Sequence, residues 1–288
     1  MGTAAAFEAV KPRLFGLAYR MLGSRAEAED VVQESYVRWH QADEASIRNA
    51  EAWLVTTATR LAIDRLRALK VEREAYVGPW LPEPLIGTPP PPPDRDVELS
   101  SDLSIAFLVL LERLAPEERA AFLLHDVFDC GYTEIASLLG KTEAASRQIV
   151  HRARGRVRDE QPRFHTTEAA RVRMLKTFVA AVEARDEKAL LQLLAPDATW
   201  TADGGGKAAA VPHPIEGAAA IVKLLLGLQK RFERDGITMH LATVNGEAGL
   251  LVNLGDRVGA AITIVTDGER ISSAYAVVNP DKLPPTIQ

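Results

Sequence analysis

The sequence offers little that would cross-link the chain or anchor it in a membrane. Its 288 residues include a single cysteine, Cys130, so no disulfide can form within the chain. No stretch approaches the roughly 20 consecutive apolar residues that a membrane-spanning helix needs. The opening residues, MGTAAAFEAV, lack the basic and apolar regions of a signal peptide, and Ala6 breaks the N-myristoylation pattern. We therefore expect a cytoplasmic protein that makes no membrane contact.

A strong charge excess is also missing. The chain has 34 lysines and arginines against 39 aspartates and glutamates, and its net charge is −5. With 47% hydrophobic residues it is typical of globular proteins, and its length allows about two domains. A protein of this balance that binds nucleic acid must gather its positive charge locally, and residues 60–73 and 147–163 do so. No metal-ligand or cofactor motif stands out, so we expect neither.

Residues 116–158 have the pattern of a helix-turn-helix. Pro116 and the two acids after it suit a first helical turn, which places a helix start just before them. Thr133 is a candidate cap for a second helix, and Gly140 is expected to end that helix in a tight turn. Thr142 is a candidate cap for a third helix.

The third helix is strongly basic, with five arginines and a histidine against one early acid, Glu143. Ile149, Ala153 and Val157 lie four residues apart and should face the protein. The opposite face, toward solvent or DNA, carries Ala145, Arg147, Gln148, His151 and Arg152. A basic helix after a short glycine turn suits a recognition helix in a DNA major groove. The alternative is an ordinary amphipathic helix with a solvated basic face.

The N-terminal residues 7–73 read as helices. Ser24 can cap a helix whose AEDVVQE segment presents an acidic surface beside two valines. The next helix, NAEAWLVTTATRLAIDRLRALK, mixes Trp53 with threonines and arginines, which suits contact with the bases and phosphates of separated DNA strands. Taken singly, the acids would more often form a solvated face and the tryptophan would more often be core.

Together, the AEDVVQE helix, the AWL and TTATRLAIDRLR helix and the helix-turn-helix resemble a bacterial RNA polymerase sigma factor of the extracytoplasmic-function class, over residues 7–158. In that family the first helix meets the clamp helices of the core polymerase, the second engages the minus-ten promoter element, and the last reads the minus-thirty-five element. The resemblance implies polymerase contacts at Asp30, Gln33 and Glu34. It implies DNA contacts at Asn49, Trp53, Arg60, Asp64 and Arg65 for the first element, and at Arg147, Gln148, His151 and Arg152 for the second.

Between the two helical parts lies a segment at residues 76–100, which we call the linker and which contains GPWLPEPLIGTPPPPPDRD. It is too rich in proline for a continuous helix and should be extended. Trp80 and Leu81 give this linker something to bury, so we expect it to dock on another part of the chain. The alternative is that Trp80 packs on its own helical domain.

The composition changes after residue 165. A helix is expected from Thr166, and a second, DEKALLQLL, should stop at Pro196. A short strand, ATWTAD, a loop and a third helix follow. The remaining segments alternate as strands do, with hairpin turns expected at Asn245–Gly246 and Asp267–Gly268. This order predicts an α+β cone with a curved antiparallel sheet.

The cone resembles the SnoaL-like branch of the NTF2-like superfamily over residues 165–282. Three short motifs, WLPEP in the linker, DGGGK at 203–207 and NPDKL at 279–283, make the whole chain similar to sigma factors of the SigJ type, which carry a fused SnoaL-like extension. DGGGK is not a phosphate loop, because no Ser or Thr follows its lysine; a tight turn that displays Asp203 and Lys207 is expected. Regulatory contacts within the chain are expected at Trp80, Leu81, Asp203, Lys207, Asn279, Asp281 and Lys282.

Some SnoaL-like relatives are cyclases or isomerases that use an aspartate or a histidine as acid and base. Asp203, His213 and His240 are the candidates in this chain. Nothing in their spacing indicates a catalytic dyad or a metal site, so no catalytic residue is expected.

The sequence thus predicts a multidomain fold, with two all-α sigma domains, the second a helix-turn-helix, followed by an α+β NTF2-like cone. The expected boundaries are 1–75 for sigma domain 2, 76–100 for the linker, 101–162 for sigma domain 4 and 163–288 for the cone. We expect a non-enzymatic subunit that partners core RNA polymerase and promoter DNA and is modulated by its own cone. The alternatives are a SnoaL-type enzyme recruited by its helices and a ligand-sensing transcriptional regulator.

Overall fold

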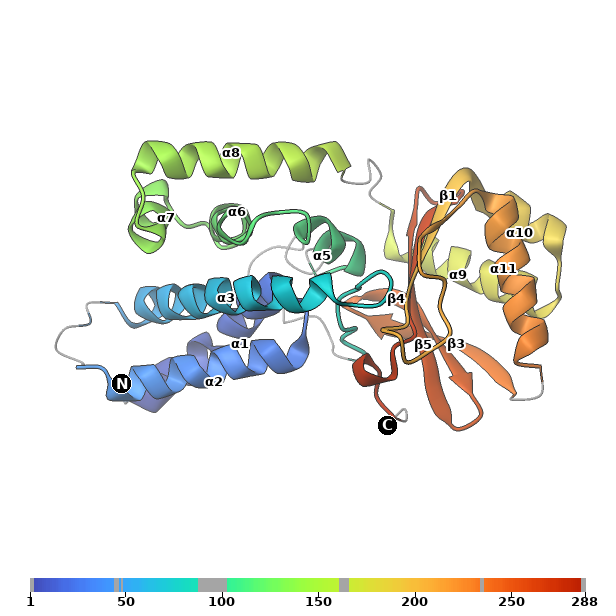
Figure 1. The fold of residues 1–288 in the computed structure, drawn as a ribbon, viewed down its shortest axis with the longest axis horizontal. Coiled ribbons are helices and arrows are strands. Elements are labelled where there is room, and N and C mark those ends of the chain that lie inside the picture. Colours follow the sequence, from blue (N-terminus) through green and yellow to red (C-terminus); the bar gives the residue numbers. More distant parts are fainter. Residues whose placement is uncertain are drawn as a thin grey trace. The chain divides into compact units, whose positions relative to one another are not determined.

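The chain forms two compact units (Figure 1). The structure is a computed structural model that describes residues 3–43, 47, 49–87, 103–160, 166–233 and 236–285. The helical unit comprises Met1–Glu74 and Phe107–Gln161, and the second unit comprises Ala75–Ala106 and Pro162–Gln288. The proline run at 89–93 and the expected boundary at 162 lie outside the described residues. Among the helices in the described ranges, none has the length and apolar character to span a bilayer.

The helical unit begins with α1 (Thr3–Leu22), α2 (Arg25–Gln41) and α3 (Ala50–Glu74). Ser24 caps α2 as predicted, because its side-chain oxygen accepts a hydrogen bond from the Glu27 backbone N–H. Apolar side chains at helical spacing fill the core of this part, and Leu14, Leu17 and Leu54 have no exposed surface.

The second part of the helical unit consists of α5 (Ile105–Leu111), α6 (Pro116–Phe122), the π-helical turn η2 (Leu123–Val127), α7 (Tyr132–Leu139) and α8 (Glu143–Glu160). Pro116 opens α6, as predicted. Gly140 ends α7 with φ of 63°, a left-handed conformation that glycine adopts freely. Thr142 caps α8 by accepting a hydrogen bond from the Ala145 backbone N–H. The predicted helix-turn-helix is therefore present.

The start of α7 differs from the prediction. Its cap is Gly131, not Thr133, and the Gly131 backbone N–H donates to the Glu134 carboxylate at 2.8 Å. Thr133 lies in the first helical turn, where its hydroxyl donates to Glu143 at 3.2 Å. A carboxylate three residues into the helix satisfies the first backbone N–H, so the threonine is not needed as a cap.

The second unit carries the cone. Its elements are α9 (Glu168–Glu183), α10 (Glu187–Leu193), β1 (Leu194–Asp203), β2 (Ile215–Glu216), α11 (Ala218–Arg231), β3 (Ile237–Val244), β4 (Glu247–Leu254), β5 (Arg257–Thr266), β6 (Ile271–Val277) and the 3-10 turn η3 (Pro280–Lys282). The expected α+β architecture is confirmed. The two predicted hairpin turns are also present: Asn245–Gly246 joins β3 to β4, and Asp267–Gly268 lies between β5 and β6.

The sheet has the strand order β2-β1-β6-β5-β4-β3. Its neighbouring strands are antiparallel except for β1 and β6, which are parallel. The prediction of an antiparallel sheet is therefore wrong at this pair. Each of the three connections from β3 to β6 reverses the chain, so β6 runs opposite to β3. β1 runs in the same direction as β6.

The junction of α10 and β1 also differs from the prediction. The helix ends at Leu193, and the strand begins at Leu194 instead of in the ATWTAD segment. Leu194 is extended, almost fully buried, and pairs with Ile271 of β6. Pairing across the sheet therefore overrides the local helical pattern. Pro196 lies within the irregular part of the pairing, between Leu194 and Thr199, where a missing N–H is tolerated.

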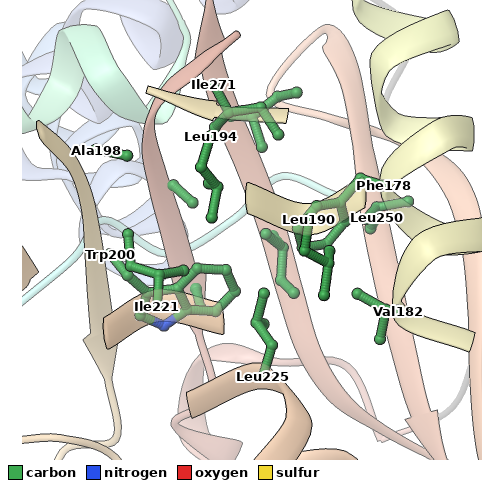
Figure 2. Packing of buried hydrophobic residues seen from close by; sticks show 14 of the residues in the cluster. Phe178, Val182, Leu190, Leu194, Ala198, Trp200, Ile221, Leu225, Leu250 and Ile271 are labelled. Atoms are coloured by element: carbon green, nitrogen blue, oxygen red, sulfur yellow. The ribbon is translucent and has the colours of Figure 1, made fainter. Parts of the chain in front are cut away.

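Large side chains fill the space between one face of the sheet and the helices that cover it (Figure 2). They come from β1, β4, β5, β6 and all three helices, and the set includes Phe178, Val182, Leu190, Leu194, Trp200, Ile221, Leu225, Leu250, Ile262, Ile264 and Ile271. The alternation of strand residues puts Ala198, Trp200 and Ala202 on this face. Asp203, at the end of β1, therefore points to the other face.

Candidate functional site

The outer face of α8 is polar and accessible. Its exposed side chains include Arg147, Gln148, His151 and Arg152. The opposite stripe, formed by Ile149, Ala153 and Val157, is at most 7% exposed. The predicted division of the helix into two faces is confirmed. Arg147 is held in place by Glu143, at 2.7 Å, and its guanidinium lies 4.8 Å from the centre of the Tyr132 ring.

Two of the arginines on α8 are committed to the helical unit itself. Arg154 donates to Asp126 at 2.7 Å, and Arg156 donates to Glu118 at 2.6 Å. The hydrogen bond to Asp126 raises the pKa of Arg154, which keeps it charged. These pairs hold α8 on α6 and η2, so the basic character seen in the sequence is only partly a ligand-facing surface.

The acidic face of α2 is exposed as its sequence suggests. Asp30, Gln33 and Glu34 are all exposed and lie within about one helical turn of each other. Val31 and Val32 are buried at 5% and 6% exposure, so they fix the orientation of the helix. Glu34 pairs with Arg38 of the same face at 2.9 Å.

The five residues implied for the minus-ten element have different environments on α3. Asn49 caps the helix, because its side-chain oxygen accepts a hydrogen bond from the Ala52 backbone N–H at 3.0 Å. Arg60 and Asp64 are exposed. Trp53 is half-buried against Trp39, with ring centres 5.5 Å apart, and therefore packs in the core as well.

Arg65 is the fifth of these residues, and its guanidinium is occupied by two acids. It forms a bidentate pair with Glu27 of α2, including a bond of 2.6 Å, and a further bond of 3.1 Å to Glu72. The hydrogen bond to Glu27 raises the pKa of Arg65, although partial burial opposes this. In this state Arg65 joins α2 to α3.

A cavity of about 470 Å³ lies at the start of α3. Its lining includes Asn49, Ala52 and Thr56 at this end of the helix, and Thr133 and Ser137 of α7. The first residues of the implied minus-ten surface therefore face the helix-turn-helix across this cavity within the helical unit.

A largely buried charge cluster, which we call the Glu112 cluster, joins the first helices to α6; side-chain exposure is 20% for Glu112 and 1% for Arg119. Glu112 pairs with Arg119 at 2.7 Å and with Arg73 at 2.5 Å. The same two arginines reach the end of α1: Arg119 donates to the Met21 carbonyl at 2.7 Å, and Arg73 donates to the Leu22 carbonyl at 2.6 Å. Cations at the C-terminus of a helix meet the negative end of its dipole.

In the Glu112 cluster one carboxylate is shared by two guanidinium groups. Burial alone would raise the pKa of Glu112, but the charges of Arg119 and Arg73 hold it below its usual range. Burial lowers the pKa of Arg73. Arg119 has no exposed surface, and its Nε and Nη2 atoms find no hydrogen-bond partner among the described residues. Unsatisfied buried donors weaken this packing.

A second buried charge site, which we call the Asp203 site, lies where the linker meets the cone. Asp203 has no exposed surface. Its carboxylate accepts hydrogen bonds from the Tyr76 hydroxyl at 2.6 Å, the Leu81 backbone N–H at 2.8 Å and the Lys282 ammonium at 2.7 Å. Burial and the bond to Asp203 raise the pKa of Tyr76, so the phenol stays protonated and can donate. One carboxylate therefore collects two donors from the linker segment and one from the C-terminal turn.

The NPDKL turn completes the Asp203 site. Lys282 also donates to the Leu81 carbonyl at 2.6 Å, and its ammonium lies 4.2 Å from the centre of the Trp80 ring. The Asn279 side-chain amide donates to the Tyr76 hydroxyl at 2.8 Å. Five of the seven residues expected as regulatory contacts are thus brought together.

The glycines of DGGGK allow this close approach. Gly205 has φ of 57°, and a Cβ atom there would lie 2.3 Å from the Asn279 amide nitrogen and 2.7 Å from the Tyr76 hydroxyl. The predicted tight turn is confirmed, but Asp203 is buried beneath the linker segment instead of being displayed. Lys207 is exposed, and it forms an ion pair with Asp281 at the rim.

The three residues considered for catalysis do not form a group. Asp203 lies in the bonded site at the end of β1, His213 is exposed in a loop, and His240 lies on β3. Three strands separate β1 from β3 in the sheet. Within the described residues, no three His, Cys, Asp or Glu side chains are grouped as a metal site requires.

Comparison with known proteins defines the class. Residues 6–71 match the family model for Sigma-70 region 2, and residues 104–157 match the model for Sigma-70 region 4. These matches coincide with α1 to α3 and with the helix-turn-helix part. The chain is therefore built on the two conserved regions of a sigma factor.

Similar proteins narrow down the kind of sigma factor. The chain is 39% identical to "ECF RNA polymerase sigma factor SigJ" of Mycobacterium tuberculosis, over 96% of this chain and 91% of that protein. It is 32% identical to "Probable ECF RNA polymerase sigma factor SigI" of the same species, over 67% of each. The crystal structure of M. tuberculosis SigJ superimposes with a TM-score of 0.76 at 35% identity, covering 97% of both chains. The chain belongs to the extracytoplasmic-function RNA polymerase sigma factors.

Proposed function

We propose that this chain binds core RNA polymerase, recognises promoter DNA with α3 and α8, and directs transcription initiation under the control of its own cone. The full-length similarity to a sigma factor, together with the exposed polar face of α8, carries this proposal. Asp30, Gln33 and Glu34 are the proposed polymerase contacts. Their exposure on one face of α2 supports this assignment.

The proposed reading of the minus-thirty-five element uses Arg147, Gln148, His151 and Arg152. Arginine can bond bidentately to guanine, and glutamine to adenine, in a major groove. On α3 we propose contacts from Asn49, Trp53, Arg60 and Asp64 with the minus-ten element. Arg65 could contact DNA only after leaving Glu27, so its present role is to position α3 against α2.

Initiation on this proposal requires the helical unit to open. The end of α3 that carries Asn49 faces α7 across the cavity, so a DNA strand that entered this cavity would meet α7 unless the two parts moved apart. The Glu112 cluster is one of the contacts that would break. Arg119 in this cluster has two donors without partners in the described part of the chain, so the packing is weaker than a fully bonded one. Binding of the polymerase could therefore displace it.

The proposed control by the cone acts through the linker. A fused domain is held at roughly millimolar effective concentration, so it can bind the linker without high intrinsic affinity. Tyr76, Trp80 and Leu81 of the linker contact Asp203 and Lys282 of the cone, which supports this route of control. Lys207 and Asp281 would add a weaker contact at the rim.

We propose that the chain is a regulator and not an enzyme. Asp203, which an acid–base mechanism would use, accepts three hydrogen bonds, and the two histidines lie elsewhere. Turnover of a small polyketide-like substrate by the cone would instead support the enzyme alternative. Tight operator binding without polymerase would support a ligand-sensing repressor, and a gel shift with and without core polymerase separates these readings.

In vitro transcription tests the proposal. Core polymerase is mixed with the full chain and a randomised promoter pool, and the selected promoter is then used with variants. Because each base or phosphate contact contributes about 1–3 kcal/mol, charge reversal at Arg147 and Arg152 together should reduce specific initiation at least tenfold. Binding to the core polymerase should stay unchanged. The matched control is Arg173→Glu, an exposed arginine on α9.

Two results would overturn the proposal. The first is a purified chain that does not join the core polymerase. The second is a double charge reversal at Arg147 and Arg152 that leaves start-site selection and yield equal to those of the Arg173→Glu control.

A further inference from the structure

The turn between β3 and β4 contains an asparagine, Asn245, that is more buried and makes more distant hydrogen bonds than a hairpin turn requires. Asn245 has φ of 54° and Gly246 has φ of 82°, as expected for a two-residue hairpin with both residues left-handed. Such a turn explains the residue type, because asparagine tolerates this conformation. It does not explain burial, since hairpin tips usually face solvent, whereas Asn245 is 1% exposed.

The buried amide of Asn245 bonds to two segments far away in the sequence. Its Oδ1 accepts a hydrogen bond from the Leu85 backbone N–H at 2.9 Å, and its Nδ2 donates to the Leu103 carbonyl at 2.8 Å. Its own backbone N–H donates to the Leu85 carbonyl at 2.9 Å. One residue of the cone thus contacts the chain on both sides of the proline-rich segment.

The linker is also added to the edge of the sheet at this point. β3 is the last strand of the sheet, and Ile86 forms an antiparallel bridge with its final residue, Val244. The Gly87 backbone N–H donates to the Thr243 carbonyl at 3.0 Å. An extended peptide that pairs with a free strand edge is a common mode of recognition, and here the peptide belongs to the same chain.

The two side-chain bonds of Asn245 bring residues 85 and 103 together. Their bonded atoms lie on either side of one amide group, so they are within roughly 8 Å of each other. The stretch of chain between these two residues could reach about 55 Å if fully extended. With both bonds formed, the chain between residues 85 and 103 can therefore add little to the separation of the two sigma domains.

We infer that Asn245 is a positioning residue that binds both ends of the proline-rich segment to the cone and so limits the separation of the two sigma domains. This inference rests on the proposed function. The two promoter elements lie about 25 base pairs apart, or roughly 85 Å along B-DNA. With residues 85 and 103 held together, two sigma domains of about 30 Å diameter keep only residues 75–84 for this span, and Tyr76 and Leu81 in that stretch are themselves bonded to Asp203. The bonds to Leu85 and Leu103 must open before the promoter is engaged.

Two substitutions separate the two bonds. Asn245→Asp keeps an acceptor for the Leu85 N–H and replaces the donor to Leu103 with an oxygen, so it should release Leu103 alone. Asn245→Gly keeps the left-handed turn and removes both side-chain bonds. The matched control is Asp267→Gly in the β5–β6 turn, where the carboxylate accepts hydrogen bonds from the backbone N–H groups of Glu269 and Arg270.

Hydrogen exchange and transcription are measured on the full-length variants. We expect exchange to rise about tenfold at residues 103–110 in both Asn245 variants, and at residues 85–87 only in Asn245→Gly. Initiation at limiting protein concentration should rise about fivefold for each bond removed, in the order control, Asp variant, Gly variant. The control should match the wild type at residues 85–87, at residues 103–110 and in transcription.

Unchanged exchange at both residues 85–87 and residues 103–110 would overturn the inference. So would faster exchange with initiation that stays equal to the control or falls below it. If no protein initiates transcription, including the wild type, the proposed sigma function fails while the exchange data still decide whether Asn245 holds the linker.

Discussion

The Glu112 cluster of the helical unit and the Asp203 site of the cone each place one carboxylate among distant segments, but the Glu112 side chain keeps 20% of its surface exposed and Asp203 keeps none. Glu112 has two guanidinium groups around it, and one of these has two nitrogens without partners among the described residues. Asp203 has one ammonium and two neutral donors. A buried charge is tolerated when its partners match it, so the second site should be the firmer one.

The kinds of donor differ as well. The Glu112 cluster relies on long arginine side chains, while the Asp203 site includes a backbone N–H and a cation over the Trp80 ring. Long flexible side chains lose more rotamer freedom when they are ordered than a backbone group that is already fixed. A regulated sigma factor of this design would therefore open within its helical unit before its linker leaves the cone.

The largest effect is expected at the Asp203 site. Lys282→Ala leaves the buried Asp203 carboxylate without its counter-ion, which should reduce stability by about 3–5 kcal/mol. Thermal unfolding followed by circular dichroism measures the loss, and Lys188→Ala, an exposed lysine of α10, is the control. If Lys282→Ala unfolds at the same temperature as the control, the Asp203 site is not the firm contact described here.

An intermediate effect is expected at the Glu112 cluster. Glu112→Gln keeps the shape but removes the carboxylate charge that Arg73 and Arg119 share, which should cost about 2 kcal/mol and push the two parts of the helical unit apart. Small-angle scattering should show a larger radius of gyration than for Glu187→Gln, an exposed control on α10. A radius equal to that of the control would contradict the proposal that the helical unit opens before the linker leaves the cone.

The smallest effect is expected at the rim of the Asp203 site. Lys207 and Asp281 pair, but each side chain keeps 57% of its surface exposed. Surface ion pairs contribute about 0–1 kcal/mol, so Lys207→Ala should shift the unfolding midpoint by less than about 2 °C. A shift as large as that of Lys282→Ala would show that the rim and the buried site act as one unit.

Local patterns in the sequence were sufficient for much of the fold. Pro116, Gly140, Thr142 and Ser24 take the positions that their chemistry predicts, because caps and turns depend on a few neighbouring residues. Thr133 and Leu194 behave differently, because Glu134 supplies the capping acceptor and pairing with β6 extends the strand. Both corrections come from a partner that competes with the local preference.

The site shows the same division. Exposure of Arg147 and Arg152 follows from the helical period, but the engagement of Arg65, Arg154 and Arg156 by acids of other segments does not. Charge counting along a helix cannot distinguish a ligand-facing arginine from one that holds the fold, since both are equally basic. The acids that decide this lie about 28 to 38 positions away.

The sequence by itself determined the sigma class, the helix-turn-helix, the α+β cone and the segments that meet at the Asp203 site. Only the tertiary structure decided that Asp203 is buried, that Glu112 lies between two arginines and that Asn245 bonds both Leu85 and Leu103. Caps, turns and helical faces arise from contacts within about four residues, which the sequence displays directly. Burial and hydrogen bonding between distant segments depend on which surfaces meet after folding.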